Sequence, residues 1–223
     1  KSRDVLQKLT DTDLSNDNFK WLTGKFINVG IAQAHALRVN FVGELGWELH
    51  HPMEMQNLIF DLVMEAGAEF GIKPFGIRAM GTMAVEKSYR LVGRELSIEY
   101  SAYESGLDRF VHPNKGDFIG RDELVKRHAA GDEWTYVTME VHNIKDCDAR
   151  GSEAVYDASG TLVGRVTTGS YGWRVGKSLA LARVKPEHSA DGTRLQVKIL
   201  GELFVATVIA ESPFDADNER LRA

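Results

Sequence analysis

Apolar side chains recur with a helical period over residues 54–70, in the segment EMQNLIFDLVMEAGAEF. The positions that share one face are three or four residues apart, and they are Met55, Leu58, Ile59, Leu62 and Val63. This spacing is typical of an amphipathic helix that buries one stripe of side chains. Gly71 and Pro74 follow the last apolar position and predict the end of the helix.

A second helix is predicted within residues 75–90, FGIRAMGTMAVEKSYR. Its apolar stripe consists of Ile77, Met80, Ala84 and Val85. Arg78 lies beside this stripe near the start of the helix, where the helix dipole disfavours a positive charge. We therefore expect a negative group to compensate Arg78.

Residues 38–52, RVNFVGELGWELHHP, read as two short strands that meet at a GELG turn. In the second strand Trp47 and Leu49 share one face, while Glu48 and His50 share the other. Glu48 therefore faces away from the core side. Two interpretations stay open: Glu48 lies in water on a half-exposed strand, or it lines a cavity and accepts a pair of adjacent N–H donors.

From Trp134 onward the pattern changes to short alternating runs separated by Gly, Asp and Ser turns. This pattern predicts a compact antiparallel β domain of about six strands. The polar segment 127–133 marks the expected boundary, which divides the chain into residues 1–130 and 131–223. At the other end, Ser2 is a candidate N-cap for a short helix, and the opening KSRDVLQKLT suggests a piece of a longer polypeptide.

Composition narrows the function classes. The chain has 223 residues, with 27 Lys and Arg against 32 Asp and Glu, and its net charge of -5 argues against a nucleic-acid partner. The longest apolar runs fall far short of the ~20 residues of a membrane helix. Cys147 is the only cysteine, so no internal disulfide can form, and the count fits a reducing compartment.

Several motifs point to no specific chemistry. YGWRVGKSL is one residue short of a phosphate-binding loop and precedes a strand-like run, which favours a β-hairpin with glycine turns. The adjacent pair His50 and His51 would point to opposite faces of a strand, so no metal site is expected. Cys147 in KDCDAR could act as a nucleophile but lacks a nearby base. GRELSIEY and GRDEL are predicted to be solvated turns and helix starts.

Several longer segments, in a fixed order and spacing, resemble the folate-dependent aminomethyltransferase family typified by the glycine cleavage T-protein. They are FVGELGWEL, KPFGIRAMGTMAVEKSYRLVGREL, YESGLDRFV, KGDFIGRDEL, GRVTTGSYGWRVGKSLALARV and SPFDADNERLR. The chain is most similar to the C-terminal region of sarcosine and dimethylglycine dehydrogenase-like flavoproteins. The resemblance implies an α/β (α+β) folate-binding domain of the aminomethyltransferase type, followed by a small antiparallel β-barrel.

The resemblance also implies a tetrahydrofolate site. Glu48 matches the family glutamate that binds the pterin, beside the motif aromatic Trp47, and Glu44 looks like the structural member of the pair. Arg78 matches the arginine that holds the carboxylate end of folate. Phe41 stands where the family motif has tyrosine, so it would keep ring packing but lose a hydroxyl.

Two further positions depart from the T-protein pattern and favour the flavoprotein branch. Arg109 stands where T-proteins have an aromatic residue, and Arg220, in NERLR, is a candidate contact for the folate tail. The family's catalytic aspartate has no counterpart in residues 1–40 and is expected upstream, so no catalytic residue is assigned.

The implied activity is one-carbon transfer. An N-methyl amine would be oxidised by FAD in an absent N-terminal part of the parent enzyme, and folate would capture the carbon as 5,10-methylenetetrahydrofolate. This chain alone is then expected to be weakly active or inactive. The alternatives are a glycine cleavage T-protein and a non-catalytic folate-binding module. The expected compartment is the cytoplasm, or else the mitochondrial matrix.

Overall fold

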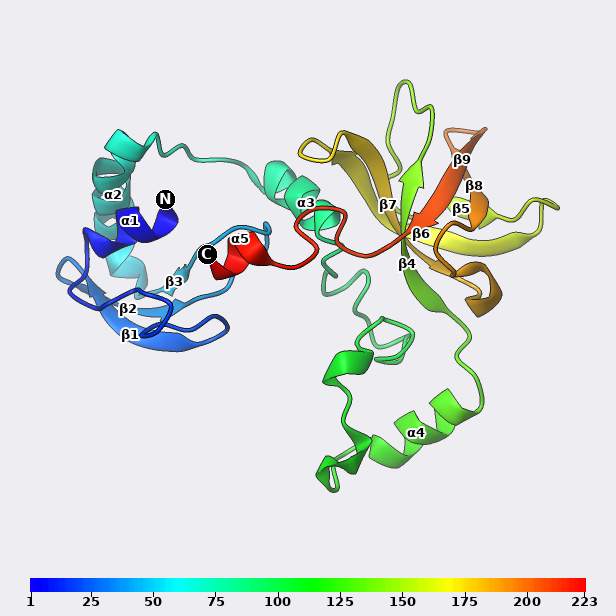
Figure 1. The fold of residues 1–223 in the computed structure, drawn as a ribbon, viewed down its shortest axis with the longest axis horizontal. Helices are drawn as coiled ribbons and strands as arrows, with labels where there is room; N and C mark the ends of the chain where they lie inside the picture. Colours follow the sequence, from blue (N-terminus) through cyan, green and yellow to red (C-terminus); the bar gives the residue numbers. More distant parts are fainter. The chain divides into compact units, whose positions relative to one another are not determined.

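A computed structural model describes all residues from 1 to 223. Internal contacts divide the chain into two compact units (Figure 1). Unit 1 comprises Lys1–Gly81 together with Asp215–Ala223, and unit 2 comprises Thr82–Phe214. Each unit has a hydrophobic core of its own.

Unit 1 is a small sheet with helices packed on one face. The antiparallel strands β1 (Gly24–Val29), β2 (Ala32–Leu37) and β3 (Glu48–His50) lie in the order β1-β2-β3. The helices are α1 (Ser2–Gln7), α2 (Gln56–Gly67), which lies between the single turns η1 (Met53–Met55) and η2 (Ala68–Phe70), and the C-terminal α5 (Glu219–Arg222). Alternate residues of β1 and β2 form the core with α1 and α2.

The helix predicted over residues 54–70 is confirmed as the continuous run of η1, α2 and η2. Gly71 ends it with a positive φ of 73°, a conformation that glycine adopts without a Cβ clash. Ile59 is buried in the core, and Leu58 and Val63 pack against it. The predicted stripe therefore faces the sheet.

The second predicted helix is α3 (Ile77–Glu86), which is shorter than the segment 75–90. Ala84 and Val85 are buried as predicted, but Ile77 is 79% exposed. The helix ends because Ser88 turns the chain with a φ of 54°. At this end the buried Glu86 carboxylate accepts hydrogen bonds from the backbone N–H and the guanidinium of Arg174.

Unit 2 is built on a closed antiparallel barrel in the order β4-β7-β6-β5-β8-β9. The strands are β4 (Thr135–Val141), β5 (Ala154–Tyr156), β6 (Leu162–Gly172), β7 (Lys177–Val184), β8 (Arg194–Ile199) and β9 (Glu202–Ile209). Unit 2 also carries α4 (Arg121–Ala129) and the single turns η3 (Asp108–Phe110), η4 (Pro113–Lys115) and η5 (Pro186–His188). The prediction of about six antiparallel strands is confirmed, and inward-facing valines, leucines and alanines fill the barrel.

Three local predictions have different outcomes. YGWRVGKSL forms the β6–β7 hairpin, as predicted, with β7 starting at Lys177. The strand expected in RVNFV is wrong, because β3 pairs instead with β2 and residues 38–47 form a loop between them. The solvated reading of GRELSIEY is wrong at Glu95, which is fully buried and bonded to Thr168 and the backbone N–H of Leu91.

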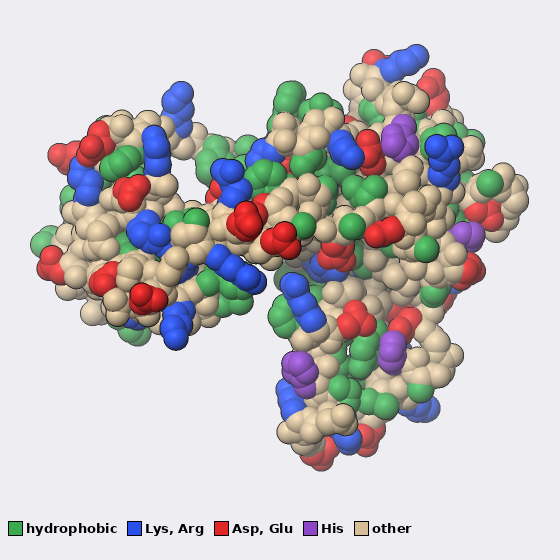
Figure 2. Space-filling view, viewed as in Figure 1, with side chains coloured by type: hydrophobic (Ala, Val, Ile, Leu, Met, Phe, Trp, Pro, Cys, Tyr) green, Lys and Arg blue, Asp and Glu red, His purple; other side chains and the backbone are tan.

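The surface carries both signs of charge. On the face shown in Figure 2, Lys and Arg side chains are interspersed with Asp and Glu. Among the helices, none has both the length and the hydrophobicity needed to cross a membrane.

Candidate functional site

The loop 38–47, which carries the first part of the candidate site, is organised by one side chain. The Oδ1 atom of Asn40 accepts hydrogen bonds from the backbone N–H groups of Val42 (3.0 Å), Gly43 (2.8 Å) and Glu44 (3.3 Å). The Nδ2 atom of Asn40 donates to the carbonyl of Glu44. This arrangement is an Asx turn, in which a side chain takes the place of a strand partner. It gives the loop a single backbone path.

Arg38 fixes the start of this loop from inside unit 1. Its side chain is 1% exposed, and Nη1 donates to the carbonyl of Phe19 at 2.7 Å. Burial lowers the pKa of Arg38, and the charge of Arg3 acts in the same direction. Nη2 reaches the carbonyls of Arg222 (3.4 Å) and Ala223 (3.3 Å), so Arg38 also joins the loop to the C-terminal segment.

Trp47 closes the loop and belongs mainly to the core. Its ring meets Phe19 edge-on at 6.1 Å, and the guanidinium groups of Arg3 and Arg38 each lie 5.9 Å from its centroid. The indole Nε1 is buried without a hydrogen-bond partner. Phe41, on the same loop, is half-buried. The structure therefore places Trp47 as support for its neighbour Glu48.

Glu48 begins β3, opposite Leu37 of β2. Its side chain is 52% exposed, and its Oε2 atom lies 3.2 Å from Nε2 of His50. Leu49 points the other way and packs against the core. The predicted alternation of faces is confirmed, and it leaves an exposed carboxylate on a rigid strand that can accept N–H donors from outside the chain.

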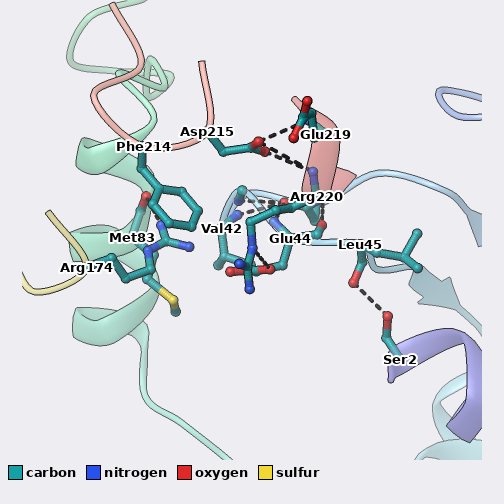
Figure 3. Close-up of polar contacts among 12 residues, drawn as sticks. Ser2, Val42, Glu44, Leu45, Met83, Arg174, Phe214, Asp215, Glu219 and Arg220 are labelled. Atoms are coloured by element: carbon teal, nitrogen blue, oxygen red, sulfur yellow. Dashed lines mark hydrogen bonds and ion pairs between the residues drawn. The ribbon is translucent and has the colours of Figure 1, made fainter. Parts of the chain in front are cut away.

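Glu44 and Arg220 form an ion pair, with Arg220 Nε 2.8 Å from Glu44 Oε2 (Figure 3). The hydrogen bond that Arg220 donates to Glu44 and the negative charge of Glu44 raise the pKa of Arg220, and the charge of Asp215 adds to this. Asp215 also accepts the backbone N–H of Glu219 at 3.0 Å and so caps α5. The pair lines a cavity of about 390 Å³ in unit 1. The ion pair thereby brings Arg220 to the GELG loop.

Ser2 lines the same cavity and corrects one prediction. It is the first residue of α1, and its hydroxyl donates to the carbonyl of Leu45 at 2.7 Å, also visible in Figure 3. It is therefore not the N-cap of the helix. The hydroxyl instead ties α1 to the loop.

Arg78 is the second residue of α3 and is exposed. Its guanidinium forms no hydrogen bond or ion pair, so the compensation expected from the sequence does not come from this chain. An unpaired cation at the positive end of a helix is a favourable place for an anionic ligand group.

Arg109 is the one candidate in unit 2. It lies in η3, is exposed, and stacks its guanidinium on the ring of Phe110 at 4.7 Å. Phe41, Trp47 and Glu48 share the loop–β3 segment of unit 1.

Sequence reasoning missed two residues that organise this segment. Asn40 could have been found, because an asparagine three residues before a glycine, here Gly43, is a signal for an Asx turn. It also missed Arg38, which no local pattern marks as a buried side chain.

No group of three His, Cys, Asp or Glu side chains in the chain is arranged to hold a metal ion. Cys147 is half-buried beside the carbonyl of Asp148. His51 contacts only the carbonyl of Pro52, at 2.9 Å, among polar groups. The candidate site of unit 1 therefore consists of carboxylate and arginine side chains rather than a cluster of metal ligands.

Comparison with known proteins gives two family matches. The GCVT N-terminal domain matches residues 1–115, and the glycine cleavage T-protein C-terminal barrel domain matches residues 135–215.

Individual relatives agree with these matches. Mitochondrial dimethylglycine dehydrogenase of Homo sapiens is 39% identical over 212 residues, which are 95% of this chain and 24% of that protein. An aminomethyltransferase of Koribacter versatilis is 36% identical over 94% of this chain and 55% of its own length. The crystal structure of aminomethyltransferase T of the glycine cleavage system from Bartonella henselae shares the fold, with a TM-score of 0.82 at 17% identity over 96% of this chain and 57% of that one. The chain thus spans about a quarter of the dehydrogenase it matches.

Proposed function

The chain belongs to the glycine cleavage T-protein (GCVT) family, as its motifs predicted, and from this membership we propose that it is a tetrahydrofolate-binding, one-carbon-transfer region of a larger enzyme. The parent would be a sarcosine or dimethylglycine dehydrogenase-like protein that acts on an N-methyl amine. The similarity to dimethylglycine dehydrogenase over nearly the whole chain supports this branch of the family.

One observation carries the proposal: Glu48 is an exposed carboxylate on β3, a strand paired with β2. The pterin ring presents adjacent N–H donors on one edge, and a carboxylate can accept two parallel hydrogen bonds from such an edge. The Asx turn at Asn40 and the packing of Trp47 hold Glu48 in place without any ligand. A prepositioned acceptor loses little conformational freedom on binding.

The opposite end of folate carries carboxylates, and the chain offers cations for them. Arg78 has no partner of its own and is the first choice for the folate tail. Arg220 is held beside the GELG loop by Glu44 and is a second candidate, and Arg109 is a third. Phe41, half-buried on the loop that leads to Glu48, would supply apolar contact to the ring system. Within unit 1, Glu48 and the arginines thus offer opposite charges for the two ends of a folate.

A second polar side chain of β3, His50, lies beside Glu48. Its ring nitrogen Nε2 lies 3.2 Å from the carboxylate of Glu48. When bound, tetrahydrofolate would supply its nitrogen N5 as the acceptor of the one-carbon unit, and the chain's own contribution would be to orient the ring.

Oxidation of the amine requires a flavin, and we place the FAD site outside this chain. No Gly-x-Gly-x-x-Gly fingerprint occurs in residues 1–223. The catalytic aspartate of the family is likewise placed upstream. We also keep the division at residues 1–130 and 131–223 as a proposal, supported by family matches that end at 115 and begin at 135.

Calorimetric titration with tetrahydrofolate under reducing conditions tests the proposal. Saturable binding is expected for the wild-type chain, with affinity reduced by about tenfold or more in Glu48→Ala and in Arg78→Ala, because each loses a charge-assisted contact. Glu65→Ala on α2 and Arg194→Ala on β8 are matched exposed controls that should bind as the wild type does. No binding by the folded wild-type chain, or equal loss in the controls, would contradict the proposed site.

A second candidate function is that of an aminomethyltransferase without a flavin partner, which the similarity to the Koribacter versatilis protein favours. The two candidates differ in what the parent polypeptide carries. Bound flavin absorbance in the parent, bleached by an N-methyl amine, is expected under the first proposal. Aminomethyl transfer to tetrahydrofolate without any flavin would support the second.

A further inference from the structure

Unit 2 contains a polar cavity of about 530 Å³ that the folate proposal does not use. Three chain segments enclose it: the turn 93–99, the turn 150–152 and residues 165–167 of β6. Each segment contributes one arginine and one hydroxyl. These side chains are Arg94, Ser97, Arg150, Ser152, Arg165 and Thr167.

The backbone of these segments is fixed by close approach. Gly151 has a φ of +131°, and a Cβ at this position would meet the carbonyl oxygen of Thr167 at 2.6 Å. The backbone N–H of Ser152 donates to the carbonyl of Val166 at 2.8 Å. The register of β6 against β7 shifts between Val166 and Thr168, which marks a bulge beside the cavity. Only glycine fits at position 151, and it brings Arg150 against the bulge.

The arginines around the cavity are weakly neutralised. The guanidinium of Arg150 has no partner, and that of Arg94 meets only the hydroxyl of Thr168 at 3.4 Å. Arg165 donates to the Tyr100 hydroxyl at 2.9 Å and lies 3.9 Å from Glu99, the one carboxylate that lines the cavity.

Two other carboxylates lie nearby but are already bonded. Glu153 accepts the backbone N–H groups of Arg150 (2.9 Å) and Gly151 (2.7 Å). Glu95 accepts the Thr168 hydroxyl and the backbone N–H of Leu91. The hydrogen bonds of Glu95 and Glu153 are made with these donors, and none is made with an arginine side chain that lines the cavity.

A buried cation adjoins Arg165. Arg183 is directly opposite Arg165 in the β6–β7 pairing and is 1% exposed. Its Nε and Nη1 atoms have no hydrogen-bond partner, and its guanidinium stacks on Tyr100 at 3.7 Å. The Nη2 atom of Arg183 donates to the carbonyl of Glu95, which holds this side chain inside unit 2 next to Arg165.

We propose that this cavity is a binding site for a small phosphorylated molecule. A phosphoryl group is a tetrahedral dianion that can accept hydrogen bonds from several directions, which suits three arginines on three separate segments. A planar carboxylate is satisfied by one or two guanidinium groups, so it makes poorer use of this arrangement. The volume lies within the range of small-molecule sites. This proposal stands independently of folate binding.

Titration calorimetry with inorganic phosphate and with glycerol 3-phosphate tests the site, at a constant ionic strength set by chloride to keep general screening equal. Saturable binding is expected, and Arg150→Gln and Arg165→Gln should each weaken it by about tenfold or more. Arg150→Gln is the sharper variant because its guanidinium has no structural contact to lose. Arg194→Gln on β8 is the matched control and should bind as the wild type does.

Thermal unfolding of each variant checks that unit 2 remains folded. The proposal is overturned if the folded wild-type chain shows no saturable phosphate binding, or if Arg194→Gln loses as much affinity as Arg150→Gln. Tighter binding of succinate than of either phosphate compound would also overturn it, because the site would then prefer carboxylates. Tetrahydrofolate titration of Arg150→Gln separates this site from the folate proposal: its affinity should equal that of the wild type.

Discussion

At the scale of single residues, two arginines, Arg38 and Arg183, are almost fully buried, one in each unit. A buried cation is costly unless nearby carbonyls or aromatic faces replace its hydration. Arg38 meets this need with carbonyls of Phe19, Arg222 and Ala223. Neither arginine could be predicted as buried, because a local sequence does not show which carbonyls will meet its guanidinium.

Replacing Arg38 tests how much its buried hydrogen bonds stabilise unit 1. Arg38→Met keeps most of the stem but leaves the Phe19 carbonyl without its donor, so we expect the free energy of unfolding to fall by about 2–4 kcal/mol. Urea unfolding followed by tryptophan fluorescence measures this change. Arg194→Met on the surface of β8 should shift the midpoint little. An unchanged midpoint for Arg38→Met would show that these hydrogen bonds contribute nothing to the stability of unit 1.

Glu104 makes the stability of unit 2 depend on pH in the acidic range. Burial favours its protonated form, but hydrogen bonds from Ser101 and the backbone of Glu133, with the charge of Arg127, outweigh this and lower the pKa of Glu104. A pKa lower in the folded than in the unfolded state stabilises the protein above the unfolded pKa, about 4.3 for glutamate, and this contribution is lost as pH falls through the folded pKa.

Glu104→Gln should therefore lower the melting temperature at neutral pH and flatten its decline in acid. Differential scanning calorimetry between about pH 7 and pH 3 measures both effects. Glu123→Gln on the exposed face of α4 serves as the control. Parallel pH profiles for the wild type and Glu104→Gln would refute the assignment.

At the scale of elements, regular strands and helices follow from the sequence, whereas the functional loop does not. The barrel strands β4 to β9 bury alternate side chains, and helix α2 buries side chains three or four residues apart. Both spacings can be recognised within the sequence of the element itself. The loop 38–47 is apolar enough to resemble a strand, but Asn40 captures the backbone N–H groups that a sheet partner would need. A competition between side-chain and strand hydrogen bonds is not visible in a hydrophobic pattern.

Asn40 therefore offers a test of the loop as an element. Asn40→Ala should lower the free energy of unfolding by about 1–3 kcal/mol, because it removes the acceptor of three backbone N–H groups. Asn40→Asp keeps that acceptor, loses only the donor to Glu44, and should be less destabilised. Chemical denaturation of the two variants compares them. Equal stability of Asn40→Ala and the wild type would mean that the loop is held by other contacts.

At the scale of the whole molecule, unit 1 is assembled from two distant parts of the sequence. The segment Asp215–Ala223 returns to unit 1, where Leu221 is buried and Arg220 pairs with Glu44. These contacts join residues far apart in the sequence, and nothing in NERLR specifies such distant partners. Unit 2, by contrast, is one continuous segment whose barrel closes by the pairing of β4 with β9.

This difference predicts how the molecule responds to truncation after Phe214. Loss of Asp215–Ala223 removes the ion pair of Arg220, the C-terminal carbonyls that accept from Arg3 and Arg38, and the buried Leu221. We expect unit 1 to unfold at a lower temperature, because burial of one leucine alone contributes about 2–3 kcal/mol, while the barrel keeps its transition. Near-ultraviolet circular dichroism resolves the two, and Leu221→Ala separates core burial from ion pairing. A single unfolding transition that shifts as a whole would show that the two units unfold together.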